Sequence, residues 1–522
     1  MLELKNISIS INERNLVENF NFTLNSGDKA VIIGEEGNGK STLLKLIYDE
    51  SHVAYCQHSG QITKKGTLAY LPQSFPERLL GLSLEDYFAD DLAPEAVSQS
   101  APNLARLGLS LNFASSPQII RTLSGGEKIK IQLAKILFSQ PDILLLDEPT
   151  NDLDLDTLEW LEGFIAISRQ PMLFISHDET LIENTANVII HLEQLMRKTK
   201  SKVTVARSGY ADYVKARNLS FSRQTQVAKK QRADHKAQME RWQQIYNRVD
   251  HEGRNIAKGD RDFIGGMLKK KMKSVKSTGK RLEKQSEDFM EIPEMEEAIL
   301  TQFDPKIAIP QGKVVLSIEL PGLYAGEPGE SSAEVGSVLE PGATGRKLCG
   351  PINLSITGPQ KIGIVGQNGV GKSTLLKKIW EALQERKDIT AVYMPQDYAD
   401  ILDYSQSVID FLAADAHKDT ITKVRTYLGS MKFTPDEMLG QIAKLSGGQK
   451  AKILFLDMVL KGANVLVLDE PTRNFSPLSA PEIRRTLKDF EGAVISVSHD
   501  RKYLDEVCDV VYTLNKEGIM SI

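Results

Sequence analysis

Short apolar runs recur along the chain and end in two kinds of polar segment. The runs at Ala30–Ile33 and Ile362–Val365 lead into glycine-rich segments. Similar runs at Ile143–Leu146 and Val465–Leu468 lead into pairs of acidic residues. Uninterrupted apolar runs of this length are typical of central strands in a parallel sheet, which are buried on both faces. The pattern therefore predicts an α/β fold with parallel sheets.

The segment from about Tyr210 to Met290 has a different pattern. It contains no proline and is rich in residues with high helix propensity. The polar, glycine-containing piece Asp250–Asp260 interrupts it, so we expect two antiparallel helices joined at a tip, and a helix of about 35 residues would reach roughly 50 Å. The apolar residues recur at approximately heptad spacing, at Met239, Trp242, Tyr246 and Val249, then at Leu268, Met272, Val275, Leu282 and Phe289.

One series of motifs occurs twice in the same order, which predicts two homologous domains. Gly34–Ser41 (GEEGNGKS) recurs as Gly366–Ser373 (GQNGVGKS). We place the domains at residues 1–200 and 306–522, joined by a basic helical linker over residues 201–305 with its tip near 250–262. The polar piece Gly326–Gly345 is predicted to be a mobile surface insertion. Later spacings also agree: Gln73 to Ser124 and Gln396 to Ser446 are 51 and 50 residues, Ser124 to Asp147 and Ser446 to Asp469 are both 23, and Asp147 to His177 and Asp469 to His499 are both 30.

The repeated glycine-rich motif has the chemistry of a phosphate cradle. Its glycines allow successive backbone N–H groups to face a phosphate, and the helix that follows presents its N-terminus to the anion. Lys40 and Lys372 would reach the β- and γ-phosphate oxygens, and the hydroxyls of Ser41 and Ser373 would bind Mg²⁺. Because both copies follow an apolar strand and start a helix, we predict two ATP sites.

A second pair of motifs distinguishes this chain from other P-loop proteins. Leu123–Glu127 (LSGGE) and Leu445–Gln449 (LSGGQ) each run into a helix. Ser124 and Ser446 can cap those helices, and the side-chain-free residues after them also suit a γ-phosphate. One domain cannot place both of its phosphate-binding surfaces on one nucleotide. We therefore expect each signature motif to complete the site of the other domain when ATP draws the domains together.

The acidic pairs and two histidines supply the expected catalytic groups. Asp147 and Asp469 would hold Mg²⁺ through water. Glu148 and Glu470 follow them and could orient or deprotonate the attacking water. His177 and His499, which follow apolar runs at equal offsets, could contact the γ-phosphate.

Taken together, these motifs resemble the ABC ATPases over about three quarters of the chain. Tandem domains joined by a charged helical hairpin, without membrane spans, are similar to the ABC-F subfamily of translation-associated ATPases. The resemblance implies a cytoplasmic monomer whose two domains pair within one chain. It implies that the hairpin enters the E site of the 70S ribosome, contacts 23S rRNA and points toward the peptidyl-transferase centre and the P-site tRNA.

Two sequences are most similar to the antibiotic-resistance branch of this subfamily, LDEPTRNFSPLS in the second domain and RDFIGGMLKKKMKSVK after the tip. By that resemblance, the protein protects ribosomes from lincosamides, streptogramins A and pleuromutilins. A housekeeping translation factor is the alternative. An ATPase subunit of a transporter and a DNA-repair ATPase are less favoured, because neither explains the basic hairpin.

Charge supports the ribosomal hypothesis. The whole chain has a formal net charge of −5. Residues Lys215–Phe289 contain 20 Lys and Arg against 9 Asp and Glu, a net charge of +11, so the rest of the chain carries −16. A basic hairpin between acidic domains favours binding to nucleic-acid phosphates, although a solvated spacer is the alternative. Trp242, Tyr246 or Phe263 could stack on a base.

The two ATP sites are not expected to be equal. Ile11 stands roughly where an aromatic residue would stack on adenine, whereas Tyr324 can do so in the second domain. The first D-loop, Asn151–Asp154, has an acid where the second, Arg473–Ser476, ends in serine. Cys56, Cys349 and Cys508 lack metal-ligand spacing, so no zinc site or iron–sulfur cluster is expected.

The predicted residues fall into four sets. The catalytic set is Glu148, Glu470, His177 and His499. The Mg²⁺ set is Ser41, Gln73, Asp147, Ser373, Gln396 and Asp469. The ribosome-contacting set is Arg254, Lys258, Arg261, Phe263, Lys269, Lys270 and Lys271. The ATP-binding set is Gly34, Glu35, Glu36, Gly37, Asn38, Gly39, Lys40, Ser41, Thr42, Gln73, Ser124, Gly125, Gly126, Glu127, Tyr324, Gly366, Gln367, Asn368, Gly369, Val370, Gly371, Lys372, Ser373, Thr374, Gln396, Ser446, Gly447, Gly448 and Gln449.

Overall fold

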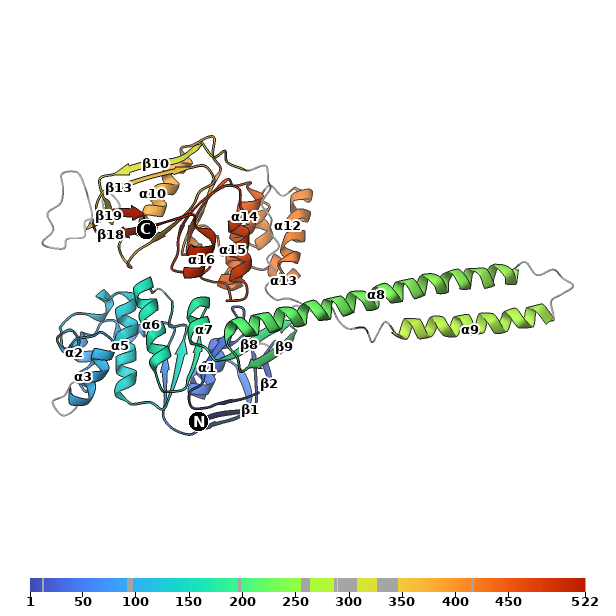
Figure 1. Ribbon diagram of the computed structural model, residues 1–522, viewed down its shortest axis with the longest axis horizontal. Coiled ribbons are helices and arrows are strands. Elements are labelled where there is room, and N and C mark those ends of the chain that lie inside the picture. Colours follow the sequence, from blue (N-terminus) through green and yellow to red (C-terminus); the bar gives the residue numbers. More distant parts are fainter. Residues whose placement is uncertain are drawn as a thin grey trace. The chain divides into compact units, whose positions relative to one another are not determined.

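Each half of the sequence repeat contains a six-stranded sheet, and the two sheets have the same strand order (Figure 1). In each, four pairings are parallel and the last is antiparallel. The first sheet is ordered β5 (Leu68–Leu71), β6 (Ile143–Asp147), β7 (Met172–Ile175), β3 (Lys29–Ile33), β8 (Val188–Leu195) and β9 (Lys200–Ala206). The second is ordered β15 (Ala391–Met394), β16 (Val465–Asp469), β17 (Ala493–Val497), β14 (Lys361–Val365), β18 (Val510–Asn515) and β19 (Gly518–Ser521).

The predicted apolar runs form the centres of these sheets. Every residue of β3, β6 and β16 is buried, which explains why their sequences are continuously apolar rather than alternating. The α/β prediction is confirmed. Strand β9 begins at the predicted end of the first domain and continues its sheet to Ala206 by pairing with β8.

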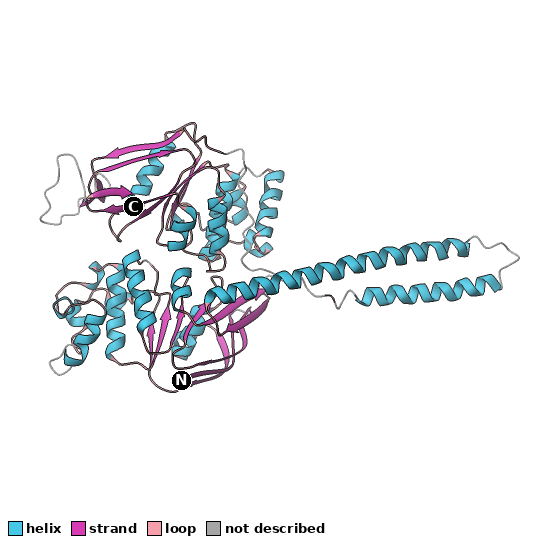
Figure 2. Ribbon diagram, in the orientation of Figure 1, coloured by secondary structure: helices cyan, strands magenta, loops and turns pink. Residues whose placement is uncertain are grey.

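Helices and smaller antiparallel strands complete both halves (Figure 2). The first half contains α1 (Lys40–Tyr48), α2 (Leu84–Tyr87), α3 (Val97–Arg106), α4 (Leu111–Ala114), α5 (Gly125–Phe138), α6 (Leu155–Ile167) and α7 (Glu179–Thr185), with β1 (Leu2–Ile11), β2 (Arg14–Leu24) and β4 (Gln57–Lys64). The second contains α10 (Lys372–Gln384), α11 (Val408–Leu412), α12 (Lys418–Ser430), α13 (Pro435–Leu439), α14 (Gly447–Leu460), α15 (Ala480–Lys488) and α16 (Arg501–Val507), with β10 (Val314–Leu320), β11 (Leu323–Ala325), β12 (Arg346–Cys349) and β13 (Ile352–Thr357).

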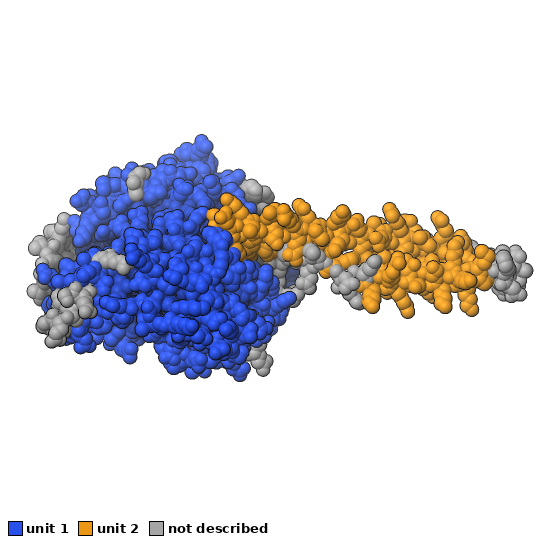
Figure 3. Space-filling model, turned by 60° about the horizontal axis from the view of Figure 1, so that its bottom comes forward, with its two compact units in different colours: residues 1–210, 296–522 blue, residues 211–295 orange. Residues whose placement is uncertain are grey.

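The computed structural model describes residues 1–11, 14–91, 97–151, 153–195, 199–254, 263–285, 289, 308–325, 346–414 and 417–521. The chain divides into two compact units (Figure 3), residues 1–210 with 296–522, and residues 211–295. The first unit holds both halves of the repeat. The predicted insertion Gly326–Gly345 lies outside the described residues. Within the described ranges, no helix combines the length and apolar character needed to cross a membrane.

The second unit is an antiparallel helical hairpin formed by α9 (Phe263–Gln285) and by α8 (Tyr210–Arg254), except that Tyr210 itself belongs to the first unit. The Trp242 indole N–H donates a hydrogen bond of 2.8 Å to the carbonyl oxygen of Val275. Nearer the start of α8, the His235 ring lies 2.9 Å from the carbonyl oxygen of Leu282. The residues of the predicted seam are buried or half-buried, so the seam prediction is confirmed.

The predicted break at Asp250 is wrong in its position. Helix α8 continues to Arg254, and Arg254 pairs with Asp250 one turn earlier at 2.7 Å. Pairs four residues apart lie on the same face of a helix and stabilise it. Residues 255–262 lie outside the described residues.

Candidate nucleotide sites and basic hairpin

Both glycine-rich motifs form the turn between a central strand and a helix. Gly34 lies between β3 and α1, and Gly366 lies between β14 and α10. A Cβ at Gly34 would lie 2.2 Å from the carbonyl oxygen of Leu192, and one at Gly366 would lie 2.3 Å from that of Leu514. Only glycine fits where the neighbouring strand approaches so closely. These turns place the N-termini of α1 and α10 where they can bind a phosphate.

The P-loop lysines are buried and fold back onto their own loops. Lys40 Nζ donates to the Gly34 carbonyl oxygen at 2.8 Å, and Lys372 Nζ donates to that of Gly366 at 2.7 Å. Burial lowers the pKa of Lys372, although Glu470 and other nearby acids oppose this effect. Both ammonium groups lie inside the phosphate cradles, so they can exchange a carbonyl partner for phosphate oxygens.

The first acid of each pair is buried at the end of its strand. Ser41 Oγ donates to Asp147 Oδ1 at 2.8 Å, and Tyr70 donates to Asp147 Oδ2 at 2.8 Å. Burial raises the pKa of both Asp147 and Asp469. Asp469 Oδ2 is buried without a hydrogen-bond partner among the described residues. An orphaned carboxylate oxygen beside the hydroxyl of Ser373 suits a hard cation such as Mg²⁺.

The second acid of each pair has an unusual backbone. Glu148 and Glu470 have φ angles of +48° and +53°. A non-glycine residue in this region is uncommon and costs roughly 1–3 kcal/mol, and such residues cluster at functional sites. The same conformation after β6 and β16 therefore supports a role for both glutamates in the reaction.

The environments of the two glutamates differ. Glu148 is surrounded by donors. Its Oε2 accepts hydrogen bonds from the amides of Gln73 and Asn151, both at 2.7 Å, and His177 Nε2 lies 3.4 Å from its Oε1. Burial by itself raises the pKa of Glu148, but His177, Lys40 and Asn151 outweigh burial and lower it to about 2. Glu148 is therefore a well-satisfied carboxylate.

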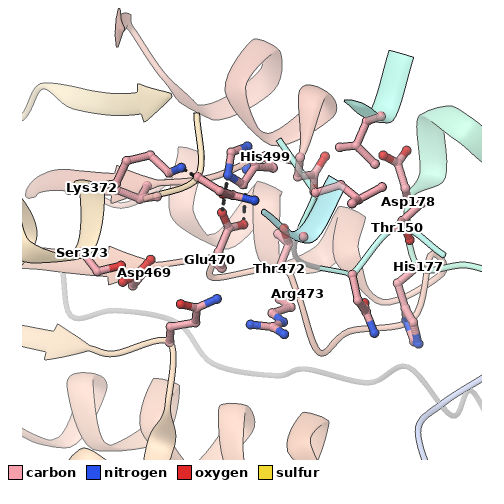
Figure 4. Close-up of a pocket in the computed structure, with 18 of the residues that line it drawn as sticks. Thr150, His177, Asp178, Lys372, Ser373, Asp469, Glu470, Thr472, Arg473 and His499 are labelled. Atoms are coloured by element: carbon pink, nitrogen blue, oxygen red, sulfur yellow. Dashed lines mark hydrogen bonds and ion pairs between the residues drawn. The ribbon is translucent and has the colours of Figure 1, made fainter. Parts of the chain in front are cut away.

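Glu470 has fewer partners. Its Oε2 accepts a hydrogen bond of 3.2 Å from the backbone N–H of His499. Its Oε1 is buried without a hydrogen bond among the described residues and lies 3.8 Å from His499 Nε2. Burial raises the pKa of Glu470 to about 8. Burial, together with Lys372, lowers the pKa of His499 to about 4. Figure 4 shows these three side chains grouped beside Ser373 and Asp469.

The signature serines begin their helices with reciprocal hydrogen bonds. Ser124 Oγ accepts from the Glu127 N–H at 3.2 Å, and Glu127 Oε2 accepts from the Ser124 N–H at 2.8 Å. Ser446 and Gln449 form the same capping box at α14. Both motifs thus fix the N-terminus of a 14-residue helix.

A cavity of about 510 Å³ joins the two halves at the second P-loop. Its wall combines P-loop and acidic residues of the second half with the signature and D-loop of the first. Thr150, His177 and Asp178 of the first half appear opposite Lys372 in Figure 4. The lining is Gly125, Thr150, Asn151, Leu153, Leu158, His177, Asp178, Glu179, Leu348, Asn368, Gly369, Gly371, Lys372, Ser373, Thr374, Gln396, Asp469, Glu470, Thr472, Arg473, Ala480, Val497, His499 and Asp500.

The first P-loop faces the second half in the same way. The Gly448 N–H donates to Glu36 Oε2 at 2.7 Å, and Ser476 Oγ donates to Glu35 Oε1 at 2.9 Å. The His177 ring lies 2.8 Å from the carbonyl oxygen of Phe475. Each P-loop therefore lies against the signature or D-loop of the other half, and each site is composite.

Some residues do not occupy the places that the sequence suggests. Tyr324 does not line the cavity, but Leu348 on the paired strand β12 does. Leu348 approaches Gly371, and Leu16 approaches Gly39 in the first half. The sequence signal that could have found this position is an apolar residue, Leu16 or Leu348, in a strand that precedes each P-loop. Of the first D-loop, Asp152 lies outside the described residues.

The hairpin residues fall into three groups. Lys269, Lys270 and Lys271 are exposed on α9, and Arg254 is exposed at the end of α8. Lys258 and Arg261 lie outside the described residues, and Phe263 begins α9 without a described side chain. Trp242 packs against Gly279 and donates a hydrogen bond to the carbonyl oxygen of Val275. The rings of Tyr246 and Trp242 pack with their centroids 5.4 Å apart. The expectation that Trp242 is free to stack on a base is therefore wrong.

Comparisons with known proteins agree with this geometry. The family model described as ABC transporter matches residues 17–151 and 349–473. The chain is 26% identical to ABC transporter F family member 2 of Arabidopsis thaliana, over 99% of this chain and 77% of the relative. It is also 26% identical to ATP-binding protein Uup of Buchnera aphidicola, over 100% of this chain and 81% of the relative.

Solved structures share the fold at low sequence identity. The archaeal ribosome recycling factor aABCE1, solved in complex with ribosomal stalk protein aP1, matches with a TM-score of 0.55 and 16% identity, over 96% of this chain and 87% of that one. ABCE1 in a model of ribosome-bound archaeal Pelota and ABCE1 matches with a TM-score of 0.51 and 16% identity, over 96% of this chain and 76% of that one.

Proposed function

Because the chain belongs to the ABC-F-type tandem ABC ATPases and hydrolyses ATP, we propose that it binds the ribosome in the cytoplasm through its basic hairpin. The observation that carries this proposal is the hairpin itself. The apolar residues at its heptad positions are buried or half-buried in the seam, while lysines such as Lys269–Lys271 are exposed. A slender basic surface of this kind suits rRNA and tRNA phosphates. The archaeal structural relatives, a ribosome recycling factor and ABCE1 in a ribosome-bound complex, are consistent with it.

The composite sites supply the energy for a two-state cycle. In the ATP-bound state, Ser124 would contact the nucleotide on the second P-loop, and Ser446 the nucleotide on the first. Mg²⁺ held through Ser41 and Asp147, or through Ser373 and Asp469, would neutralise phosphate charge. Closure fixes the hairpin for entry into the E site, and hydrolysis releases the protein.

Glu148 and Glu470 would orient the attacking water and accept its proton in their respective sites. Glu148 is a carboxylate held by several donors, whereas Glu470 is buried with a raised pKa. The histidines His177 and His499 contact these glutamates and would also face the γ-phosphate.

We further propose that the hairpin protects the ribosome from lincosamide, streptogramin A and pleuromutilin antibiotics, with a housekeeping translation factor as the alternative. The support is the similarity of the RNFSPLS and GGMLKKKMKSVK segments to the resistance branch. Expression in a susceptible Gram-positive host should raise the inhibitory concentration of at least one of these drugs. Unchanged tolerance across all three classes would favour the housekeeping role.

The ribosomal step has a direct test. The full-length protein with Glu148→Gln and Glu470→Gln should bind ATP without turnover and co-sediment with 70S ribosomes. The same protein with Lys269, Lys270 and Lys271 changed to Gln should leave the ribosome fraction. A trapped double variant that sediments free of ribosomes with ATP present contradicts ribosome binding.

A further inference from the structure

The two P-loops differ most at their second and third positions. The first loop has the carboxylates Glu35 and Glu36, where the second has the neutral residues Gln367 and Asn368. Both carboxylates of the first loop contact the other half of the protein. This asymmetry lies inside a nucleotide site and adds two negative charges where a phosphate chain is expected.

Glu36 occupies a position suited to a phosphate oxygen. Its Oε2 accepts a hydrogen bond of 2.7 Å from Gly448, the second residue of α14. That N–H is one of the first amides of a helix, which have no partner within the helix. A negative charge is stabilised there, and the bond is charge-assisted. Gly448 also belongs to the signature segment expected to contact the γ-phosphate on the first P-loop.

Glu35 joins the same loop to the second half. Its Oε1 accepts hydrogen bonds from Ser476 Oγ at 2.9 Å and from Ser479 Oγ. Both serines are completely buried. Burial by itself raises the pKa of Glu35, but Lys452 of α14 and the two serines outweigh burial and lower it. Glu35 is therefore ionised and holds the first P-loop against the second D-loop.

The second site distributes its charge differently. Its P-loop has no carboxylate, and Asp154 on the D-loop of the first half caps α6 by accepting from the Thr157 N–H at 3.1 Å. In place of an acidic bridge, this site has the cavity lined by Gly125 and Lys372. Carboxylates that reach from a P-loop to the other half are thus described at the first site only.

We propose that Glu36 is an internal competitor of the ATP γ-phosphate at the first site. In this structure its carboxylate takes the place of a phosphate oxygen at the N-terminus of α14. ATP must displace it before the signature can contact the γ-phosphate, whereas ADP has no γ-phosphate and leaves it in place. The inference rests on ATP binding at the first P-loop, a part of the proposed function, and does not depend on the ribosome.

The test measures nucleotide affinity at the first site alone. Full-length protein with Lys372→Ala would be titrated with a fluorescent methylanthraniloyl-ADP, which is then displaced by ADP or by the non-hydrolysable analogue adenylyl-imidodiphosphate. Glu36→Gln, and Glu36→Asn, which copies Asn368, should bind the analogue about tenfold more tightly, a change of about 1.4 kcal/mol. Affinity for ADP should change by less than about twofold. Glu159→Gln, which removes an exposed acid of α6, should alter neither affinity.

The reciprocal change tests the same idea at the other site. In a Lys40→Ala background, Asn368→Glu should weaken binding of the analogue to the second P-loop and spare ADP. Equal tightening of both nucleotides by Glu36→Gln would indicate general charge repulsion and overturn the proposal, as would unchanged affinity for the analogue. Failure of the fluorescent ADP to bind the Lys372→Ala protein would overturn both this inference and ATP binding at the first site.

Discussion

Glu148 and Glu470 show how the same residue in the same backbone conformation can have opposite electrostatics. Both follow a buried aspartate at the end of a central strand with positive φ. Glu148 has three hydrogen-bonding or charged neighbours in Gln73, Asn151 and His177. Glu470 lacks a comparable set, and its pKa rises to about 8 rather than falling to about 2. The difference arises from side chains brought in by other elements.

This contrast predicts opposite effects of pH and mutation on stability. A folded-state pKa of about 8 for Glu470, against an ordinary 4.5, means that stability falls as the pH rises from about 4.5 to 8. A pKa of about 2 for Glu148 means that its stabilising contribution is complete above about 4.5 and is lost as the pH falls toward 2. At pH 8 without nucleotide and Mg²⁺, Glu470→Gln should therefore raise the melting temperature and Glu148→Gln should lower it.

Calorimetry from pH 5 to 8 in the presence of a chelator measures this difference. The difference in melting temperature between Glu470→Gln and the unmodified protein should increase as the pH rises. If both variants changed the melting temperature in the same direction at pH 8, the opposite electrostatics assigned to Glu148 and Glu470 would be contradicted.

At the scale of elements, the hairpin depends on one close helix–helix contact. A Cβ at Gly279 would lie 2.6 Å from the ring of Trp242, whose indole N–H already bonds to Val275. Gly279 therefore allows α8 and α9 to approach at this point, despite the low helix propensity of glycine.

Gly279→Ala should destabilise the hairpin by about 1–3 kcal/mol because it overpacks this contact. Gly266→Ala is the matched control on α9, since a Cβ there would meet nothing within 4 Å. It should stabilise the helix by up to about 1 kcal/mol through propensity alone. Hydrogen exchange in α9 reports both effects, and similar protection in the two variants would show that the Trp242 contact is not limiting.

Within the first unit, the second D-loop lies between the first nucleotide site and Tyr210, the first residue of α8. Its Phe475 carbonyl lies at the His177 ring, and its Ser476 bonds to Glu35. Directly after it, the Pro477 carbonyl oxygen accepts a bond of 2.9 Å from the Tyr210 hydroxyl. Tyr210 is buried and is the first residue of α8. If ATP displaces this loop, the hydrogen bond between Pro477 and Tyr210 would therefore transmit the movement to the first turn of α8.

Tyr210→Phe should weaken that coupling at a stability cost of about 1 kcal/mol. ATP should change amide exchange in the first turn of α8 in the unmodified protein and should do so less in the variant. Tyr246→Phe, on the same helix but packed on Trp242, serves as the control. An unchanged ATP response in Tyr210→Phe would exclude this bond as the coupling element.

At the scale of the molecule, the halves are also joined by a cluster of ion pairs. Arg484 of the second half is buried and contacts Glu179 of the first at 2.8 Å. Lys502 reaches Glu183 at 2.6 Å, and Arg501 reaches Glu162 at 2.7 Å. A buried arginine with carboxylate partners is costly to separate. These ion pairs hold the two halves together beside the nucleotide sites.

The uneven charge of the whole chain predicts salt-dependent ribosome binding. Each phosphate contact made by a lysine adds about 0.9 to the slope of log affinity against log salt for duplex DNA, and less for single strands. Replacing Lys269, Lys270 and Lys271 with Gln should reduce that slope by about 2. Replacing the exposed lysines Lys377, Lys378 and Lys387 of the second half should leave it unchanged. Equal slopes in both triple variants would argue against the hairpin as the binding surface.

The sequence by itself determined the local parts of this protein. Buried parallel strands need continuous apolar runs, close turns need glycine, and helix seams need periodic apolar residues, so each leaves a readable pattern. These patterns predicted both P-loops, the acidic pairs and the hairpin. They did not predict the end of α8, because an i, i+4 pair between Asp250 and Arg254 extends the helix through a polar segment.

Only the tertiary structure decided which groups face each other across the two halves. The contacts of Glu36 with Gly448, of Glu35 with Ser476 and of Tyr210 with Pro477 join residues that are 412, 441 and 267 positions apart. No periodicity or spacing encodes such pairs, since they arise from how two folded halves fit together. The sequence therefore indicated that the two ATP sites differ, and the structure showed that the two P-loop carboxylates of the first site contact the other half.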